Sequence, residues 1–312
     1  MEGGNFTETL LRPRVTTLAQ DMSRLVGVVI LIMYVVIIVA NMMNILLIYC
    51  DKKLHKPMYL LICNLAAVDI VYTTSTSPTM IGFLLAGVKT ISYVPCIFQM
   101  VIYHVGGVME MFALAVMAFD RLIAVSCPFQ YQSYLTNTRI IILTYILWLA
   151  ALVFVSVMPA TVLSLTQCRP RLIYAFCDFA AVLRTTCGDL SYHFNVVTVI
   201  SFFLLFFTFF LICLSYFVIK MGSTCFSHLI VVVCYYCPLF IRIVLTRMGV
   251  VLTIEERHGL TIGSFLGPSL VNPFVYCLNT KEIKCKIFKI FNIRKGRLTT
   301  GTRKTQQKIH CW

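Results

Sequence analysis

Long apolar stretches separated by short polar segments are the main pattern of this sequence. Each stretch reaches or exceeds the length of about 20 residues that a helix needs to cross a bilayer. The apolar positions run continuously and do not alternate with polar ones, which favours helices over the strands of a membrane barrel. We therefore predict an all-α fold, a bundle of seven transmembrane helices over residues 25–49, 57–85, 96–125, 139–163, 194–219, 221–247 and 259–279.

Composition supports a membrane protein over a soluble one. Hydrophobic residues make up 59% of the 312 and charged residues 12%, whereas a soluble domain has about 25% charged residues. The first apolar stretch is also too long to be the core of a cleaved signal peptide. We expect residues 1–24 to remain as an extracellular amino terminus, residues 25–279 to form the transmembrane domain and residues 280–312 to form a cytoplasmic tail.

Positive charge is concentrated near the end of the chain. The net charge is +14, and ten of the 26 Lys and Arg residues follow residue 280. Basic residues beside a membrane helix attract anionic lipid, with about 1 kcal/mol for each charge near the surface. We expect a short amphipathic basic helix after the last span that contacts membrane lipid or a cytosolic partner, and we expect no nucleic acid as a partner.

Charge alone does not decide the orientation. With the amino terminus outside, six Lys and Arg residues before the tail fall on the cytoplasmic side and ten on the outer side, against the usual excess inside until the ten of the tail are added. Asn5-Phe6-Thr7 is a sequon, which predicts glycosylation of Asn5. The loop 164–193, on the same side, contains three cysteines, and disulfides need an oxidising compartment. We therefore predict that the amino terminus lies outside the cell.

Signatures of enzymes, metal sites and cofactors are missing from the sequence. It has no zinc-ligand spacing, no nucleophile elbow and no phosphate-binding loop. We therefore expect no enzymatic activity, no metal and no cofactor. No internal repeat is visible either, which disfavours a transporter built from inverted repeats.

Six short motifs follow one another in a fixed order along the apolar stretches. In chain order they are Leu54-His55-Lys56-Pro57-Met58-Tyr59, Asn64-Leu65 with Asp69, Met117-Ala118-Phe119-Asp120-Arg121, Ser215-Tyr216, Lys220 with Ser223-Thr224-Cys225 and Ser227-His228, and Asn272-Pro273-Phe274-Val275-Tyr276. This series resembles the vertebrate odorant receptors, which belong to the rhodopsin-like class of G-protein-coupled receptors. The match extends from about residue 25 to 290, with Phe119 and Leu122 where the family usually has Tyr.

The resemblance implies a function. It indicates a plasma-membrane receptor, expected in olfactory sensory neurons, that binds a small organic odorant and activates a heterotrimeric G protein of the olfactory, stimulatory type. Two alternatives stay open on the sequence: a receptor-like protein that folds but does not signal, and a small channel or transporter.

The resemblance also implies an activation switch. Arg121, at the cytoplasmic end of the third span, is expected to be held by Asp120 and to meet the G protein when the helices open. Anchoring of this charged pair at the membrane interface is the plainer alternative. The switch residues that the resemblance implies are Asp120, Arg121, Tyr216, Asn272, Pro273 and Tyr276.

Two acidic residues, Asp69 and Glu110, fall deep within apolar stretches. Buried carboxylates are costly unless they are paired or protonated, so the two are expected to share a proton or bind a cation. Asn41, Ser269 and Asn272 are candidates for further polar contacts. The resemblance implies a cation site beneath the ligand pocket, and a purely structural polar cluster is the alternative.

The resemblance places a ligand pocket between the outer halves of the third, fifth, sixth and seventh spans. Helical spacing from Arg121 and Tyr216 selects the inward-facing side chains, and most of them are apolar, as is usual for small-molecule sites. The predicted ligand-binding residues are Tyr103, His104, Gly107, Val108, Ile200, Leu204, Tyr236, Leu239, Ile243 and Phe265.

Four cysteines are predicted to lie on the outer side. The sequence alone permits three pairings among them. The resemblance implies the pairs Cys96–Cys177 and Cys168–Cys187. The first of these would tether the long outer loop to the third span.

The segment between the fifth and sixth spans is unusually short. Six residues, 217–222, separate Tyr216 from Ser223, where the family normally has a longer segment. A loop of about 2–5 residues must then be taken out of the helices themselves, with Gly222 as the expected break. We predict that this shortening reduces the docking surface for the G protein and weakens coupling.

Overall fold

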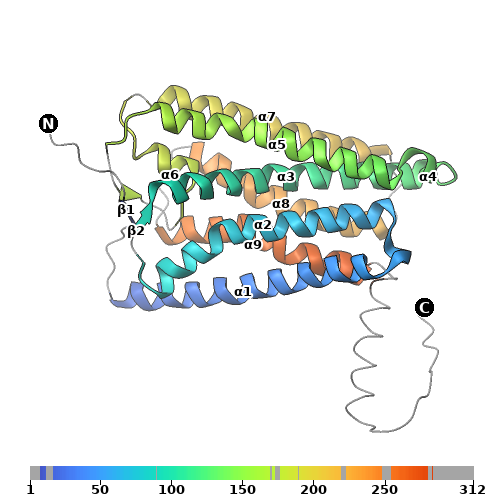
Figure 1. Ribbon diagram of the computed structural model, residues 1–312, viewed down its shortest axis with the longest axis horizontal. Coiled ribbons are helices and arrows are strands. Elements are labelled where there is room, and N and C mark those ends of the chain that lie inside the picture. The colour runs from blue at the N-terminus through green and yellow to red at the C-terminus, as the bar shows by residue number, and fades with distance from the viewer. Residues whose placement is uncertain are drawn as a thin grey trace, which may run out of the picture.

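Long helices that run side by side make up most of the molecule (Figure 1). The all-α class is confirmed, and α2 has the predicted bounds, whereas α1 begins before predicted residue 25. Within the described residues, the seven long helices are α1 (Thr17–Cys50), α2 (Pro57–Leu85), α3 (Tyr93–Ser126), α5 (Asn137–Ser164), α7 (Ser191–Val218), α8 (Ser223–Arg247) and α9 (Ile254–Asn279). The shorter ones are η1 (Lys52–Leu54), α4 (Tyr131–Tyr134) and α6 (Phe179–Leu183).

The computed structural model does not describe the whole chain. Asn5 and the predicted basic helix of the tail lie outside the described residues, apart from Ile283, so both stay predictions. The described residues are 8–11, 17–88, 90–168, 171–172, 176–188, 190–218, 223–247, 254–279 and 283.

A small three-stranded sheet lies at one end of the helices (Figure 1). The strand order is β2 (Thr90–Ser92), β1 (Glu8–Leu11), β3 (Arg171–Leu172), with β1 antiparallel to β2 and parallel to β3. The sequence did not predict these strands, because two to four residues are too few to show an alternating pattern. We call this the sheet end of the molecule, and the other the α4 end.

Local polar groups set several helix starts at the α4 end. Pro57 occupies the first position of α2, where its missing N–H is not needed and its fixed φ suits a helix. At the start of α5, the Thr136 hydroxyl accepts a hydrogen bond from the backbone N–H of Arg139 at 3.3 Å. Asp51 accepts from the backbone N–H of Lys53 at 2.9 Å and so begins the turn between α1 and α2.

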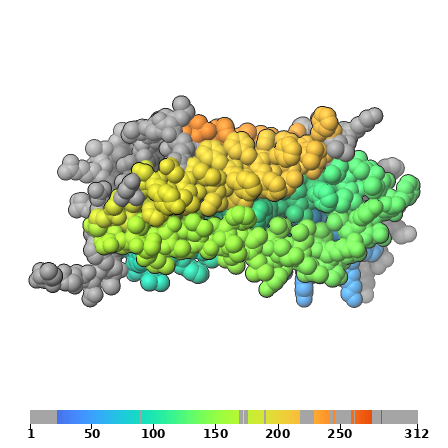
Figure 2. Space-filling view, turned by 90° about the horizontal axis from the view of Figure 1, so that it is seen from above, coloured from blue at the N-terminus to red at the C-terminus, as the bar shows by residue number. Residues whose placement is uncertain are grey.

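Much of the surface along the helices is apolar. Figure 2 shows α5, in lime, and α7, in yellow to gold, side by side over one long face. Large apolar side chains are exposed on both helices, including Val153 at 69%, Phe203 at 59% and Phe210 at 61%. Continuous apolar surface of this kind is unfavourable in water and is favourable against lipid tails.

Four helices are long and apolar enough to cross a membrane by length and composition. They cover Met22–Cys50, Pro57–Leu85, Asn137–Ser164 and Ser191–Phe217. Among the described residues, Leu229–Ile241 of α8 and Ile262–Val275 of α9 are shorter apolar segments. These helices support a multi-pass membrane protein, while the full set of seven crossings belongs to the proposal below.

Helix α3 lies among its neighbours, packing against α2, α5 and α7. Asn64 and Trp148 add a polar link beside it, because the Trp148 indole of α5 donates to the Asn64 carbonyl oxygen of α2 at 3.1 Å. The core residues of α3 are mostly apolar, with Gln99, Glu110 and Asp120 as buried polar exceptions. This central position makes α3 the element from which the candidate site is best described.

Gly106 lies where α3 comes very close to α2. A β-carbon on Gly106 would lie 2.8 Å from Cδ2, 2.9 Å from Cβ and 3.1 Å from Cα of Tyr72. Because the Tyr72 backbone cannot move away easily, we expect Gly106→Ala to lower the free energy of unfolding by about 1–3 kcal/mol. Gly82→Ala is the matched control, since its added carbon would meet Val88 at 3.9 Å. Equal thermal unfolding midpoints for the two purified variants would contradict this packing.

Candidate functional site

Two disulfides fix the connection between α5 and α7 at the sheet end. Cys96 of α3 is bonded to Cys177 with a Cα–Cα distance of 5.4 Å, and Cys168 to Cys187 with 5.6 Å. These are the two pairs that the resemblance implied. The backbone N–H of Cys168 also donates to the Thr185 carbonyl oxygen at 3.0 Å. The loop that carries α6 is therefore tied both to itself and to α3.

An aromatic cluster lies beneath this loop, formed by Tyr72, Tyr103, Phe176 and Phe265. The Tyr103 ring stacks on Tyr72 at a centroid distance of 5.1 Å and meets Phe176 edge-on at 5.3 Å and Phe265 at 6.3 Å. All four side chains are buried. Such aromatic pairs add about 0.5–1.5 kcal/mol each beyond the area they bury. Two predicted ligand-binding residues, Tyr103 and Phe265, thus belong to one cluster.

His104, the next predicted residue, joins α3 to the loop. Its Nε2 lies 3.3 Å from Oδ1 of Asp178, and its Nδ1 lies 2.8 Å from the Met100 carbonyl oxygen. Each ring nitrogen thus faces an oxygen atom, one on the loop and one on the backbone of α3. The side chains of His104 and Asp178 are 16% and 19% exposed. The pair is therefore a partly accessible polar group beside the apolar aromatic cluster.

The other predicted ligand-binding residues form a second group among α3, α7 and α8. Tyr235 donates to the Gly107 carbonyl oxygen at 2.8 Å, and Tyr236 donates to the Thr208 hydroxyl at 2.7 Å. Gly107 thus contributes a backbone acceptor to this group. The side chain of Ile243 lies outside the described residues. Buried or half-buried apolar members of the second group are Val108, Ile200, Leu204 and Leu239.

Asn272 of α9 joins the two buried acids. Its Nδ2 lies 3.0 and 3.2 Å from the two carboxylate oxygens of Asp69 and donates also to Oε1 of Glu110 at 3.4 Å. All three side chains are buried. Asn41 donates to the Ile37 carbonyl oxygen at 3.1 Å, and Ser269 is near enough to interact with Asp69. Asp69, Asn272 and Glu110 thus form one hydrogen-bonded group.

The surroundings of Asp69 restrict what the cluster can hold. A small space that does not admit a water-sized sphere lies beside Asp69, lined in part by Asn41, Asn44, Asn272 and Pro273. Neither acid takes part in a salt bridge with the part of the chain that the structure describes. In this conformation the space beside Asp69 leaves no room for a hydrated cation.

The predicted switch residues of α3 lie at the α4 end. Oδ1 of Asp120 accepts a hydrogen bond from the Tyr131 hydroxyl at 2.6 Å, whereas Nε of Arg121 is 4.0 Å from Oδ2. Burial, and then this hydrogen bond, raise the pKa of the Tyr131 phenol. Asp120 is thus held chiefly by Tyr131, and its link to Arg121 is loose.

Three further switch residues lie on α7 and α9. Tyr216 is half-buried against the core, and Pro273 is buried in α9 next to Asn272. The side chain of Tyr276 lies outside the described residues. Pro273 also removes a backbone donor from the interior of α9, which allows the helix to bend at the polar cluster.

Comparison with known families settles the class of this bundle. The family model of the olfactory receptors matches residues 30–294. The chain belongs to the olfactory receptor family. The match covers every long helix except the first part of α1.

Relatives of this olfactory receptor carry the same family name. Olfactory receptor 1500 of Rattus norvegicus is 30% identical over 280 residues, which are 85% of this chain and 89% of that protein. Olfactory receptor 1M1 of Homo sapiens is 32% identical over 276 residues, 83% of this chain and 87% of that protein. Olfactory receptor 6N1 of Homo sapiens is 33% identical over 269 residues, which are 81% of this chain and 86% of that protein. A receptor is therefore favoured over an enzyme, a channel or a transporter.

Sequence reasoning missed several residues that this olfactory receptor brings to the site. Phe176 and Asp178 flank Cys177, so the expected Cys96–Cys177 pair was a signal that could have located them. Tyr72 follows Asp69 by one helical turn on the same side of α2, which was a weaker signal. Tyr131 lies in a short polar helix with no periodic pattern, and nothing in the sequence marked it as the partner of Asp120.

Proposed function

We propose that this olfactory receptor binds a small organic odorant at the sheet end and activates a heterotrimeric G protein of the stimulatory, olfactory type at the α4 end. The observation that carries the proposal is the aromatic cluster beside the His104–Asp178 pair, under a loop held by two disulfides. Apolar walls with a few polar groups suit small volatile molecules. Expression in olfactory sensory neurons follows from this function.

All seven long helices cross the plasma membrane in this proposal. The disulfides are at the sheet end, and disulfides form in an oxidising compartment, so the sheet end and the amino terminus face outside. An odd number of crossings then puts the segment after residue 280 inside the cell. Its basic residues would contact anionic lipid there.

Hydrogen bonds between helices could couple odorant binding at the sheet end to a change at the α4 end, where the G protein would bind. Tyr235 and Tyr236 connect α8 to α3 and α7. An odorant that packs against Ile200 and Leu239 beside these bonds changes the relative stability of two positions of α8. When the α4 end of α8 moves away from α3, the loosely held Arg121 becomes available to the G protein. The short segment between α7 and α8 limits this movement and weakens coupling.

A panel of aliphatic aldehydes, alcohols and ketones tests the proposal in cells that carry a cAMP reporter. At least one member should raise cAMP in cells that display the receptor. Ile200→Trp, which enlarges a half-buried side chain in the second group of predicted ligand-binding residues, should abolish that response with surface delivery preserved. Val199→Trp is the matched control, because Val199 is 68% exposed on the same helix. The proposal fails if Ile200→Trp and Val199→Trp respond alike.

Asp69→Asn is expected to reduce any dependence of odorant potency on pH or sodium by about fivefold or more. Fivefold is about the smallest effect that one binding site usually has on the affinity of another. The reason is that Asp69 and Glu110 form the one acidic cluster near Asn272 in the part of the chain that is described. Potency is measured at two values of pH and two sodium concentrations. Thr73→Val is the control, since the Thr73 hydroxyl donates to the Asp69 backbone carbonyl at 2.7 Å and not to a carboxylate. Unchanged ion dependence in both Asp69→Asn and Glu110→Gln would make the cluster structural only.

A further inference from the structure

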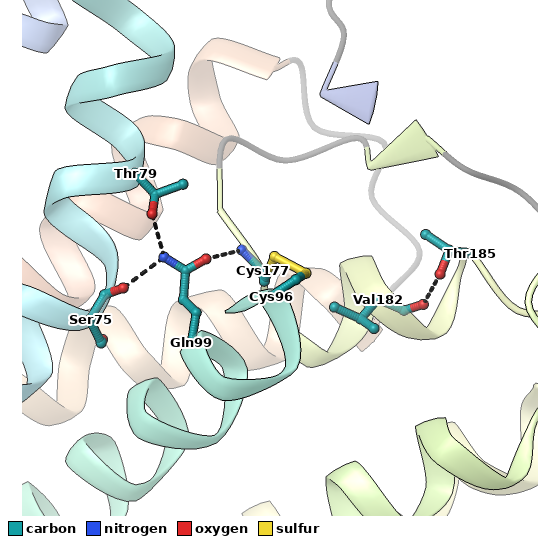
Figure 3. The surroundings of a disulfide bond; sticks show 7 residues. All are labelled: Ser75, Thr79, Cys96, Gln99, Cys177, Val182 and Thr185. Atoms are coloured by element: carbon teal, nitrogen blue, oxygen red, sulfur yellow. Dashed lines mark hydrogen bonds between the residues drawn. A yellow bond between two sulfur atoms is a disulfide. The ribbon is translucent and has the colours of Figure 1, made fainter. Parts of the chain in front are cut away.

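Gln99 of α3 connects three separate parts of the sheet end (Figure 3). Its Nε2 donates to the Ser75 carbonyl oxygen at 2.6 Å and to the Thr79 hydroxyl at 2.8 Å. Its Oε1 accepts from the backbone N–H of Cys177 at 2.9 Å. The side chain is buried, at 7% exposure. One amide thus uses both of its donors on α2 and its acceptor on the loop.

The two contacts on α2 lie at a weak point of that helix. Pro78 lacks a backbone N–H, so the carbonyl of Thr74 four residues earlier loses its usual donor and the helix is weakened there. The next carbonyl, that of Ser75, accepts from Gln99. Gln99 therefore supplies hydrogen bonds where the ladder of α2 is interrupted.

The third contact controls the backbone of the loop above the ligand site. Phe176 and Asp178, on either side of Cys177, contact Tyr103 and His104 respectively. The disulfide joins the Cys177 side chain to α3 and still permits rotation about its side-chain bonds. A hydrogen bond from the Cys177 backbone to Gln99 removes that freedom, so it fixes the positions of both neighbours.

We propose that Gln99 is a positioning residue for odorant recognition, which holds Phe176 and Asp178 over the ligand site through the Cys177 backbone N–H. The inference rests on the proposed ligand site. Gln99 itself does not contact the odorant. This role needs a side chain as long as glutamine that has an acceptor facing the loop and donors facing α2. Methionine has no donor and only a weakly accepting sulfur, and glutamate keeps only the acceptors when it is ionised.

Hydrogen exchange of the Cys177 backbone N–H tests this role without any odorant. The full-length receptor is reconstituted in lipid nanodiscs, and alkylation with mass spectrometry verifies that Cys96–Cys177 is intact. Gln99→Met should speed exchange at Cys177 on the order of tenfold, as expected for the loss of one buried hydrogen bond. Gln167→Met is the control, because Gln167 is a half-buried glutamine of the same loop that pairs with Thr186; it should leave exchange at Cys177 unchanged.

A second variant keeps the test decisive if Gln99→Met does not fold. Gln99→Glu retains an oxygen facing Cys177, so exchange there should stay within about threefold of the wild type. Wild-type exchange in Gln99→Met would overturn the proposal. Exchange in Gln99→Glu as fast as in Gln99→Met would also overturn it, as would an equal increase throughout α2 and α3.

Odorant potency provides the functional readout of the same variants. With an active member of the aldehyde, alcohol and ketone panel, Gln99→Met should lower potency about tenfold with an unchanged maximal response, because ordering of the loop would have to accompany binding. An unchanged potency would overturn the role in recognition. If no member of the panel activates the wild type, the proposed function fails, while the exchange experiment still decides whether Gln99 holds the loop.

Discussion

Cys96→Ser is expected to abolish delivery of the receptor to the cell surface. The Cys96–Cys177 bond spans a sequence separation of 81 residues, and a bond that closes a loop of this length stabilises a fold by about 4–5 kcal/mol in the chain-entropy model. Its loss also releases Phe176 from the aromatic cluster. Because the whole net stability of a protein is about 5–15 kcal/mol, the variant should be retained and degraded. Antibody staining of an amino-terminal tag on intact and permeabilised cells measures delivery.

Two control variants identify the cause of that loss. Cys213→Ser removes an exposed free cysteine of α7 and should reach the surface normally. Cys168→Ser should have a smaller effect than Cys96→Ser, because Cys168–Cys187 spans only 19 residues, worth about 3 kcal/mol in the same model. Normal staining together with a normal odorant response in Cys96→Ser would refute the structural role of the bond.

Insertion of a relative's longer segment after Ile219 is expected to raise the maximal cAMP response by at least about fivefold, the lower range of coupling between sites. Helix α7 ends at Val218 and α8 begins at Ser223, so four residues, 219–222, connect their described ends. In the proposed mechanism, the α4 end of α8 moves away from α3 on activation. We expect a short connection to α7 to restrict that movement and to remove surface on which the G protein would dock. Odorant potency should change little, since the proposed ligand site lies at the sheet end.

An inserted Gly-Ser segment of equal length separates the two effects of the short connection. It lengthens the tether without restoring a docking surface, so it should recover only part of the response. Full efficacy of the unmodified receptor, with no gain from either insertion, would show that the short segment does not limit coupling.

The helices could be predicted well because a bilayer demands continuous apolar sequence. Helix α2 has the predicted bounds, 57–85. Helix α1 begins at Thr17, well before predicted residue 25, because its first turns are polar and give no apolar signal. The strands β1 to β3 showed no sequence pattern either, because they are held by pairing among three segments that are distant in the sequence.

The candidate site could be predicted only in part. Asp69, Glu110 and Asn272 were expected to meet, and one amide nitrogen reaches both acids. Helical spacing showed which face of each helix is buried but not which neighbour covers it. The predicted ligand-binding residues therefore divide into two groups, one around Tyr103 and Phe265 and one around Leu204 and Tyr236. Loop residues such as Phe176 were missed because no periodicity governs a loop.

Nucleotide exchange on a purified stimulatory G protein shows whether this olfactory receptor activates a G protein in response to an odorant. The receptor is reconstituted in lipid nanodiscs with the G protein, and binding of a non-hydrolysable GTP analogue is followed with each member of the odorant panel. We expect at least one odorant to accelerate exchange, and Arg121→Ala to abolish the acceleration without changing binding of that odorant. If no odorant accelerates exchange, even with the longer segment inserted after Ile219, or if Arg121→Ala responds like the wild type, the chain does not activate this G protein as proposed.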